Sequence, residues 1–252
     1  MKRIYILIGL MVLAVGMKAQ TIQNQEFTKA NFYYNESKYD TALVIYEGIL
    51  KDGYVSVPLL YNIGNTYFKM KNYPMAILNY EKALKLDPTD DDIRQNLAIA
   101  NSLITDKIEP LPVFFLTKWW RDLGNMLTAN GWATVTLVFL GIFLLLLFLY
   151  FTAHTSGGKK ATFFIGIIML LLLICSSIIA IQKYNYLKER NEAIIMKPTI
   201  TVKSSPSSTG VDLFVLHEGS KVTILDNDGN WDKIKIADGS IGWLPSSASI
   251  KY

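Results

Sequence analysis

Two uninterrupted apolar runs dominate the hydropathy pattern of the chain. They cover residues 132–151 and 162–181, and neither contains a charged residue. A helix needs about 20 apolar residues to cross the hydrocarbon core of a bilayer, and a spanning segment must satisfy its own backbone hydrogen bonds. The pattern therefore predicts two transmembrane helices, at residues 132–152 and 161–182.

A third apolar run, at residues 4–15, is short for a membrane span. It follows two basic residues and ends in a stretch that includes small residues before Gln20, which is the order of regions in a secretory signal peptide. We therefore expect residues 1–19 to be a signal peptide that exports the segment after it. The two spans then return the chain to the side on which it started, with residues 153–160 as a cytoplasmic loop.

The segment at residues 110–131, just before the first span, has a helical hydrophobic period. One stripe collects large apolar residues: Val113, Leu116, Trp120, Leu123 and Leu127. Tryptophan is enriched where a protein meets the membrane–water boundary. We therefore expect an amphipathic helix lying at the interface, and an ordinary packed helix is the alternative.

An internal repeat runs through the segment between the signal and this helix. Five residues recur at one constant spacing, the repeat period: Tyr33, Tyr39, Ala42, Tyr46 and Glu47 return as Tyr67, Tyr73, Ala76, Tyr80 and Glu81. Such a period is typical of stacked helical hairpins. The second unit contains Y-N-I-G-N-T-Y-F-K, N-Y-P-M-A-I and A-L-K-L-D-P, and it resembles a tetratricopeptide repeat. We expect residues 20–109 to form tetratricopeptide repeats with a capping helix at their end.

This resemblance implies a concave groove along the first helix of each repeat, where similar proteins hold a peptide or a partner helix. On this sequence the residues expected to line the groove are Asn31, Tyr34, Asn62, Asn65, Phe68 and Lys69. Capture of a C-terminal carboxylate is disfavoured, because Phe27, Asp92 and Asn96 stand where such groove sites have cations. A stack that serves only for packing or oligomerisation is the alternative.

After a linker expected at residues 183–195, the last part of the chain has short β-prone runs separated by Asp-Gly turns. Strands are predicted at residues 199–203, 220–225, 231–236 and 241–244. The phrases L-H-E-G-S-K-V-T-I-L, W-D-K-I-K-I and D-G-S-I-G-W-L resemble the bacterial SH3-like domain. We therefore expect a small all-β SH3-like barrel at residues 196–252.

Strand alternation puts Ile234 and Ile236 on one face of the third predicted strand and Trp231 on the other. Trp231 is therefore the candidate residue of a ligand-binding face, with burial in the core of the barrel as the alternative. The resemblance implies recognition of cell-wall peptides or of protein partners. His217 is expected in a turn without a chemical role.

The inventory of reactive residues argues against catalysis. The chain has one cysteine, Cys175, within the second span, and two histidines, His154 and His217, far apart in sequence. We therefore predict no catalytic residue, no bound metal and no cofactor, so the protein is not expected to be an enzyme. The net charge of +4 is not clustered as nucleic-acid binding requires, and the spans lack the ionisable groups of a transport path.

The chain is therefore expected to be a multidomain membrane protein with all-α repeats, two spans and a small all-β barrel. This order of segments, with D-K-I-E-P-L-P before the aromatic helix, resembles the BatE type of membrane protein from aerotolerance (Bat) operons. The resemblance implies a multi-pass protein of the bacterial inner membrane with both modules in the periplasm. Its implied partners are Bat-type membrane proteins with von Willebrand A domains and a MoxR-type ATPase.

Two functions remain open at this point. The first is a non-enzymatic scaffold whose repeats and SH3-like domain bind protein partners in an envelope complex. The second is binding or sensing of peptidoglycan stem peptides through the SH3-like domain.

Overall fold

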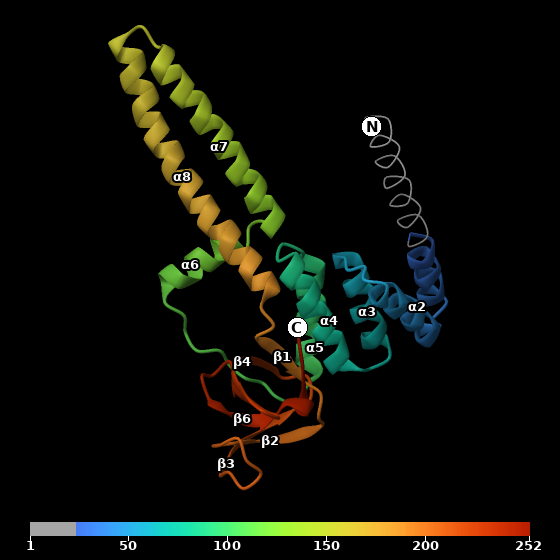
Figure 1. Cartoon of the computed structure of the whole chain (residues 1–252). Coiled ribbons are helices and arrows are strands. Elements are labelled where there is room, and N and C mark those ends of the chain that lie inside the picture. Colours follow the sequence, from blue (N-terminus) through green and yellow to red (C-terminus); the bar gives the residue numbers. More distant parts are fainter. Residues whose placement is uncertain (1–23) are drawn as a thin grey trace, which may run out of the picture. The chain divides into compact units, whose positions relative to one another are not determined.

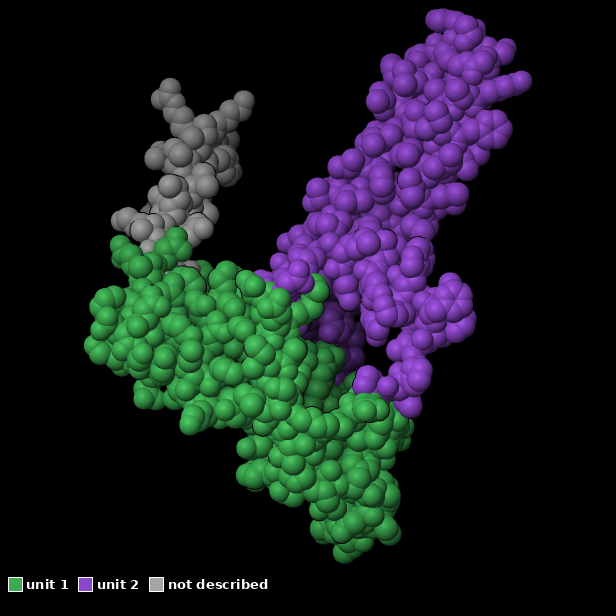
Figure 2. All heavy atoms as spheres, turned by 180° about the vertical axis from the view of Figure 1, so that it is seen from behind, with its two compact units in different colours: residues 1–83, 92–109, 192–252 green, residues 84–91, 110–191 purple. Residues whose placement is uncertain are grey.

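The computed structural model describes residues 24–252, and the expected signal peptide lies outside the described residues (Figure 1). The chain divides into two compact units (Figure 2). The repeat–sheet unit contains the described residues up to Ala83 together with Asp92–Glu109 and Glu192–Tyr252, and the hairpin unit contains Leu84–Asp91 and Pro110–Asn191. The repeat–sheet unit is therefore assembled from distant parts of the sequence.

Helical hairpins form the first part of the described chain. Residues 24–35 are helical, and the helices that follow are α2 (Tyr39–Lys51), α3 (Val57–Lys69), α4 (Tyr73–Leu86) and α5 (Asp91–Leu103). Ser56 caps the start of α3, where its side chain accepts a hydrogen bond from the Leu59 backbone at 3.3 Å. Pro58 in the first turn costs no hydrogen bond there.

The turns inside the two hairpins have the same geometry, one repeat period apart. Ser37 and Lys71 both adopt positive φ, at 58° and 62°. The backbone N–H of Ser37 donates to Tyr34 at 2.9 Å, and that of Lys71 donates to Phe68 at 3.0 Å. The first hairpin is thus a structural repeat of the second, although its sequence is the more divergent.

Small residues allow the helices to approach closely. Ala42, Ala76 and Ala83 are fully buried. A Cβ added at Gly64 would lie 2.6 Å from the ring of Tyr80, which is 1% exposed. The glycine of α3 therefore makes the space that the tyrosine of α4 fills.

The last part of the chain forms a seven-stranded antiparallel sheet in the order β3-β2-β6-β5-β4-β1-β7. The strands are β1 (Glu192–Ile195), β2 (Thr199–Lys203), β3 (Asp212–His217), β4 (Lys221–Asp228), β5 (Trp231–Lys235), β6 (Ile241–Pro245) and β7 (Ser249–Lys251). Their buried core includes Val202, Leu216, Val222, Ile234 and Leu244. The four predicted strands correspond to β2, β4, β5 and β6.

Three strands were not predicted. The strand β3 ends at His217, which was expected in a turn, and β7 is only three residues long. The expected linker at residues 183–195 contains the last turns of a helix and the whole of β1, in which Ala193, Ile194 and Ile195 are fully buried. A fragment starting at residue 196 would therefore lack a strand that lies between β4 and β7.

The hairpin unit contains α6 (Phe115–Gly124), α7 (Ala129–Thr152) and α8 (Ser156–Lys188). The helices α7 and α8 are long and apolar enough to cross a membrane, and they pack side by side (Figure 1). Between them, the Thr136 hydroxyl donates to the Ser176 hydroxyl at 3.1 Å. This hydrogen bond connects two hydroxyl groups that lie within the apolar stretches of the two helices.

The helix α6 is held against the end of α8 by polar contacts. The Trp120 indole donates to Gln182 Oε1 at 3.0 Å, and Lys183 Nζ donates to Asn125 Oδ1 at the end of α6. The neighbouring Phe115 and Trp119 are 67% and 61% exposed. An amphipathic helix is thus present in the expected segment, and its position at a membrane interface stays a prediction.

Substitution of Gly64 tests the helix packing. We expect Gly64→Ala to destabilise the repeats by about 1–3 kcal/mol, because the added methyl group must displace the buried ring of Tyr80. Gly48→Ala in α2 is the matched control, since a Cβ there meets no atom within 4 Å and alanine favours a helix over glycine. Hydrogen exchange of the α3 and α4 amides in the full chain measures both. Equal protection in the two variants would contradict the packing.

Candidate functional site

Hydrogen bonds between asparagine and tyrosine join the first three helices of the stack. Asn31 Oδ1 accepts a hydrogen bond from the Tyr46 hydroxyl at 2.5 Å and another from Asn62 Nδ2 at 2.9 Å. Burial raises the pKa of Tyr46 to about 12, although a hydrogen bond with Asn62 acts in the opposite direction. The tyrosine therefore stays a neutral donor at physiological pH and holds Asn31 in place.

The same cluster recurs one repeat period further on. Asn65 Oδ1 accepts a hydrogen bond from the Tyr80 hydroxyl at 2.7 Å and another from Asn96 Nδ2 at 3.0 Å. Asn96 Nδ2 also donates to the Tyr61 hydroxyl at 2.8 Å. Burial raises the pKa of Tyr80, and the nearby Tyr61 adds to this effect. One asparagine of α3 thus connects α3 to both α4 and α5.

The second cluster forms part of a cavity of about 270 Å³. Its lining residues are Tyr34, Asn65, Phe68, Lys69, Tyr80, Asn96 and Ile99. Four of the six residues expected in the groove are among them, while Asn31 and Asn62 belong to the first cluster. Tyr80 and Ile99 were not expected in the groove, and Asn96 was considered only as a residue at the position of a carboxylate-binding cation. Asn96 stands one repeat period after Asn62, so the repeat itself contains the signal that could have found it.

Two asparagines of the cavity lining, Asn65 and Asn96, each keep one polar atom outside the hydrogen bonds of the cluster. The Asn65 oxygen and the Asn96 amide nitrogen are used within the cluster. Within the described residues, no hydrogen bond engages Asn65 Nδ2 or Asn96 Oδ1. One carboxamide N–H and one carboxamide oxygen complement the C=O and N–H of a peptide backbone. The rings of Tyr34 and Phe68 add apolar walls, and Lys69 adds a positive charge.

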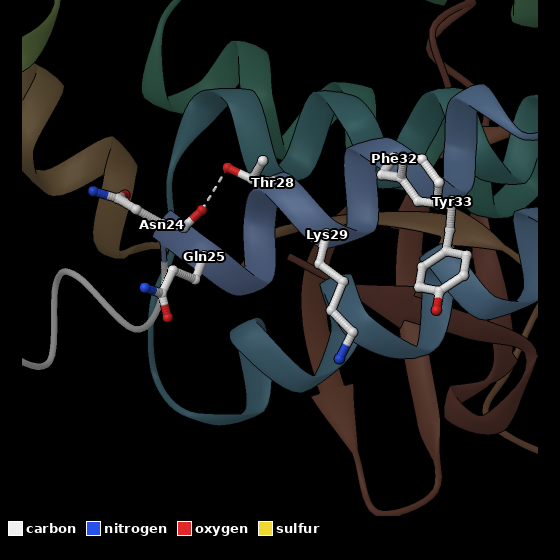
Figure 3. A pocket seen from close by; sticks show the side chains of 6 residues that line it. All are labelled: Asn24, Gln25, Thr28, Lys29, Phe32 and Tyr33. Atoms are coloured by element: carbon white, nitrogen blue, oxygen red, sulfur yellow. Dashed lines mark hydrogen bonds between the residues drawn. The ribbon is translucent and has the colours of Figure 1, made fainter.

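A second depression lies on the helix at residues 24–35 (Figure 3). Its lining includes Gln25 and Lys29, which stand one repeat period before Leu59 and Ile63. Those two residues of α3 are only 2% and 1% exposed because α2 and its neighbours cover them. This face therefore carries polar residues where the next repeat has core residues, as expected for a solvent-facing end of a stack.

The sheet carries an aromatic face of its own. Lys233 of β5 pairs with Trp243 of β6, and Trp231 lies two residues before Lys233, so the three side chains share one face. Both tryptophans are half-buried, and Lys233 Nζ lies 5.8 Å from the centre of the Trp243 ring. Trp231 is thus partly accessible, on the opposite face from the buried Ile234.

Comparison with known proteins identifies one part of the chain. Residues 57–90 match the family model of the tetratricopeptide repeat. The match covers α3 and α4, so the prediction of such a repeat is confirmed there and supports a role in protein–protein interaction. No curated protein matches the chain.

Tetratricopeptide repeats are typically non-catalytic interaction modules. Among residues 24–252, no group of three or more His, Cys, Asp or Glu side chains is arranged to hold a metal ion. The free thiol of Cys175 lies on α8. The candidate site is therefore the cavity at the second asparagine–tyrosine cluster.

Proposed function

We propose that the protein is a non-enzymatic, membrane-anchored scaffold whose tetratricopeptide repeats bind an extended segment of a protein partner. The observation that carries this proposal is the aromatic-walled cavity lined by Asn65 and Asn96, whose Nδ2 and Oδ1 atoms, respectively, take no part in the hydrogen bonds of the cluster. These two groups match one peptide unit of the partner. Lys69 favours an acidic residue next to that unit, and the helices α7 and α8 supply the anchor.

The proposed setting is an envelope complex of the Bat type in a bacterial inner membrane. The order of repeats, apolar helices and sheet supports this proposal through its resemblance to BatE-type proteins. The partners are then other Bat-type membrane proteins with von Willebrand A domains. The expected signal peptide, followed by two spans, places both the repeats and the sheet in the periplasm.

Capture of partners tests the role of the groove. We expect Phe68→Ala and Lys69→Glu to reduce by about tenfold the amount of crosslinked partner recovered with the full chain from membranes, because each removes a wall or the charge of the cavity. Phe32→Ala is the matched control, since Phe32 is 58% exposed in the depression on the helix at residues 24–35. Mass spectrometry of the recovered proteins gives the measurement.

Two results would count against the groove. One is equal recovery of the partners with all three variants. The other is that Phe32→Ala reduces recovery as strongly as Phe68→Ala, which would move the binding surface to the helix at residues 24–35.

Protease treatment of spheroplasts tests the proposed topology. We place one epitope tag after Tyr252 and a second in the loop between α7 and α8, next to His154. The tag after Tyr252 is expected to be digested, and the loop tag is expected to survive until the membrane is permeabilised, because a span separates the loop from each module. Survival of the tag after Tyr252 in intact spheroplasts would exclude a periplasmic sheet.

A second candidate function is binding of peptidoglycan stem peptides by an SH3-like domain. The observation that favours it is the shared face of Trp231, Lys233 and Trp243, which offers aromatic surface and a cation to a peptide with free carboxylates. This function does not require the groove, so the two proposals can be tested separately.

Sedimentation of the purified full chain with cell-wall sacculi tests this candidate. Trp231→Ala is expected to reduce the bound fraction by about tenfold through loss of aromatic contact. Trp119→Ala removes an accessible indole from α6 and is expected to bind like the wild type. Failure of the wild-type chain to sediment, or equal binding of all three proteins, would remove the candidate.

A further inference from the structure

The repeat register continues beyond the second tetratricopeptide repeat. Ile93 and Ala100 of α5 stand one repeat period after Leu59 and Thr66 of α3, and all four are buried. The helix α5 therefore occupies the position of the first helix of a third repeat. A stack of this kind needs an element to cover its last hairpin.

The second helix of that third repeat is missing. It would begin near Lys107, which stands one repeat period after the first residue of α4, Tyr73. Residues 104–114 are not helical, and Pro110 and Pro112 oppose a helix there. The exposed side of α4 and the end of α5 must therefore be covered in another way.

Asp106 lies just before the position where the second helix of a third repeat would begin, and it contacts the sheet. It stands one repeat period after Asn72, whose side chain accepts from the Met75 backbone at 3.3 Å at the start of α4. The Asp106 carboxylate instead accepts hydrogen bonds from the sheet. Its donors are the backbone N–H and Nδ1 of His217, both at 2.7 Å, and the Ser220 hydroxyl at 2.5 Å.

These bonds dominate the electrostatics of the carboxylate. Burial alone would raise the pKa of Asp106, but the hydrogen bonds from Ser220 and His217 outweigh it and hold the pKa below its ordinary value. The carboxylate therefore stays ionised, as an acceptor for three donors of the turn between β3 and β4.

The same turn makes apolar and ionic contacts with the helices. A Cβ added at Gly219 would lie 2.5 Å from Ile104 Cγ2 and 3.4 Å from Cδ1 of Ile77, which is fully buried in α4. One turn further along α4, Glu81 Oε2 lies 2.8 Å from Lys221 Nζ. Burial would lower the pKa of Lys221, but Glu81 and Glu192 together raise it. Ile77 and Glu81 are four residues apart, so both lie on one face of α4.

We propose that the turn at residues 217–221 takes the place of the missing helix, so that the sheet is the C-terminal cap of the repeat stack. The repeats and the sheet then fold as one unit, although residues 110–191 of the hairpin unit separate them in sequence. Both stretches must consequently lie on the same side of the membrane. The cap does not depend on what the groove binds.

Crosslinking of the full chain in membranes tests the contact directly. In a Cys175→Ser background, the pair Asp106→Cys and Ser220→Cys is oxidised, and the chain is then cut at a protease site inserted beside His154. The two fragments are expected to remain joined by a disulfide. The pair Asp106→Cys and Asn230→Cys is the control, because Asn230 lies in the turn between β4 and β5. We expect at least about fivefold more joined product with the first pair.

Equal crosslinking of the two pairs, or products that join two copies of the chain, would overturn the proposal. Because Asp106→Cys removes the carboxylate, a second pair of variants leaves it in place. Gly219 and Gly229 both have positive φ, at 89° and 58°, so alanine strains the backbone at either position. A Cβ at Gly219 meets Ile104, whereas one at Gly229 meets no atom within 4 Å.

We therefore expect Gly219→Ala to increase the hydrogen-exchange rate of the α5 amides about tenfold relative to Gly229→Ala. Both variants are compared with the wild-type chain under the same conditions. Unchanged exchange in α5 for Gly219→Ala would show that the sheet does not stabilise the helices, and the cap would be rejected.

Discussion

A helical hairpin of the repeat type cannot bury both of its faces by itself, and this constraint organises the repeat–sheet unit. Within the stack, the ring of Tyr80 fills the space above Gly64. At the first end, Gln25 and Lys29 are exposed at the positions where the next repeat has the buried Leu59 and Ile63. At the other end, contacts from the turn between β3 and β4 replace a helix.

The same packing creates the candidate site. Tyr80 is buried between α3 and α4, and its hydroxyl fixes the oxygen of Asn65. The Asn96 amide also donates a hydrogen bond to that oxygen, so Asn65 Nδ2 and Asn96 Oδ1 take no part in these hydrogen bonds. The groove chemistry thus follows from how the helices are joined. A scaffold needs such a fixed donor and acceptor, because preorganised groups lose little entropy when a peptide binds.

The hairpin unit separates parts of the repeat–sheet unit in sequence, but those parts still pack together as one compact unit. Asp106 and His217 are 111 residues apart in sequence, and most of the residues between them belong to α6, α7, α8 and the first strands. A unit closed by such contacts can form only if both stretches reach the same compartment. The helices α7 and α8 are long and apolar enough to cross a membrane, and two successive crossings return a chain to its starting side.

Local patterns determined much of this protein from sequence alone. Apolar runs located α7 and α8, and the repeat period located the helical hairpins, because both signals can be read along the chain without knowledge of its packing. The resemblance to the tetratricopeptide repeat supplied four residues of the cavity. The strands β1 and β7 were not predicted, since such short segments are stabilised by pairing with distant strands. The strand β3, which pairs with β2, was not predicted either. Only the tertiary structure placed Asn96 beside Asn65 and brought His217 to Asp106, because a hydrogen bond between distant segments depends on how those segments pack.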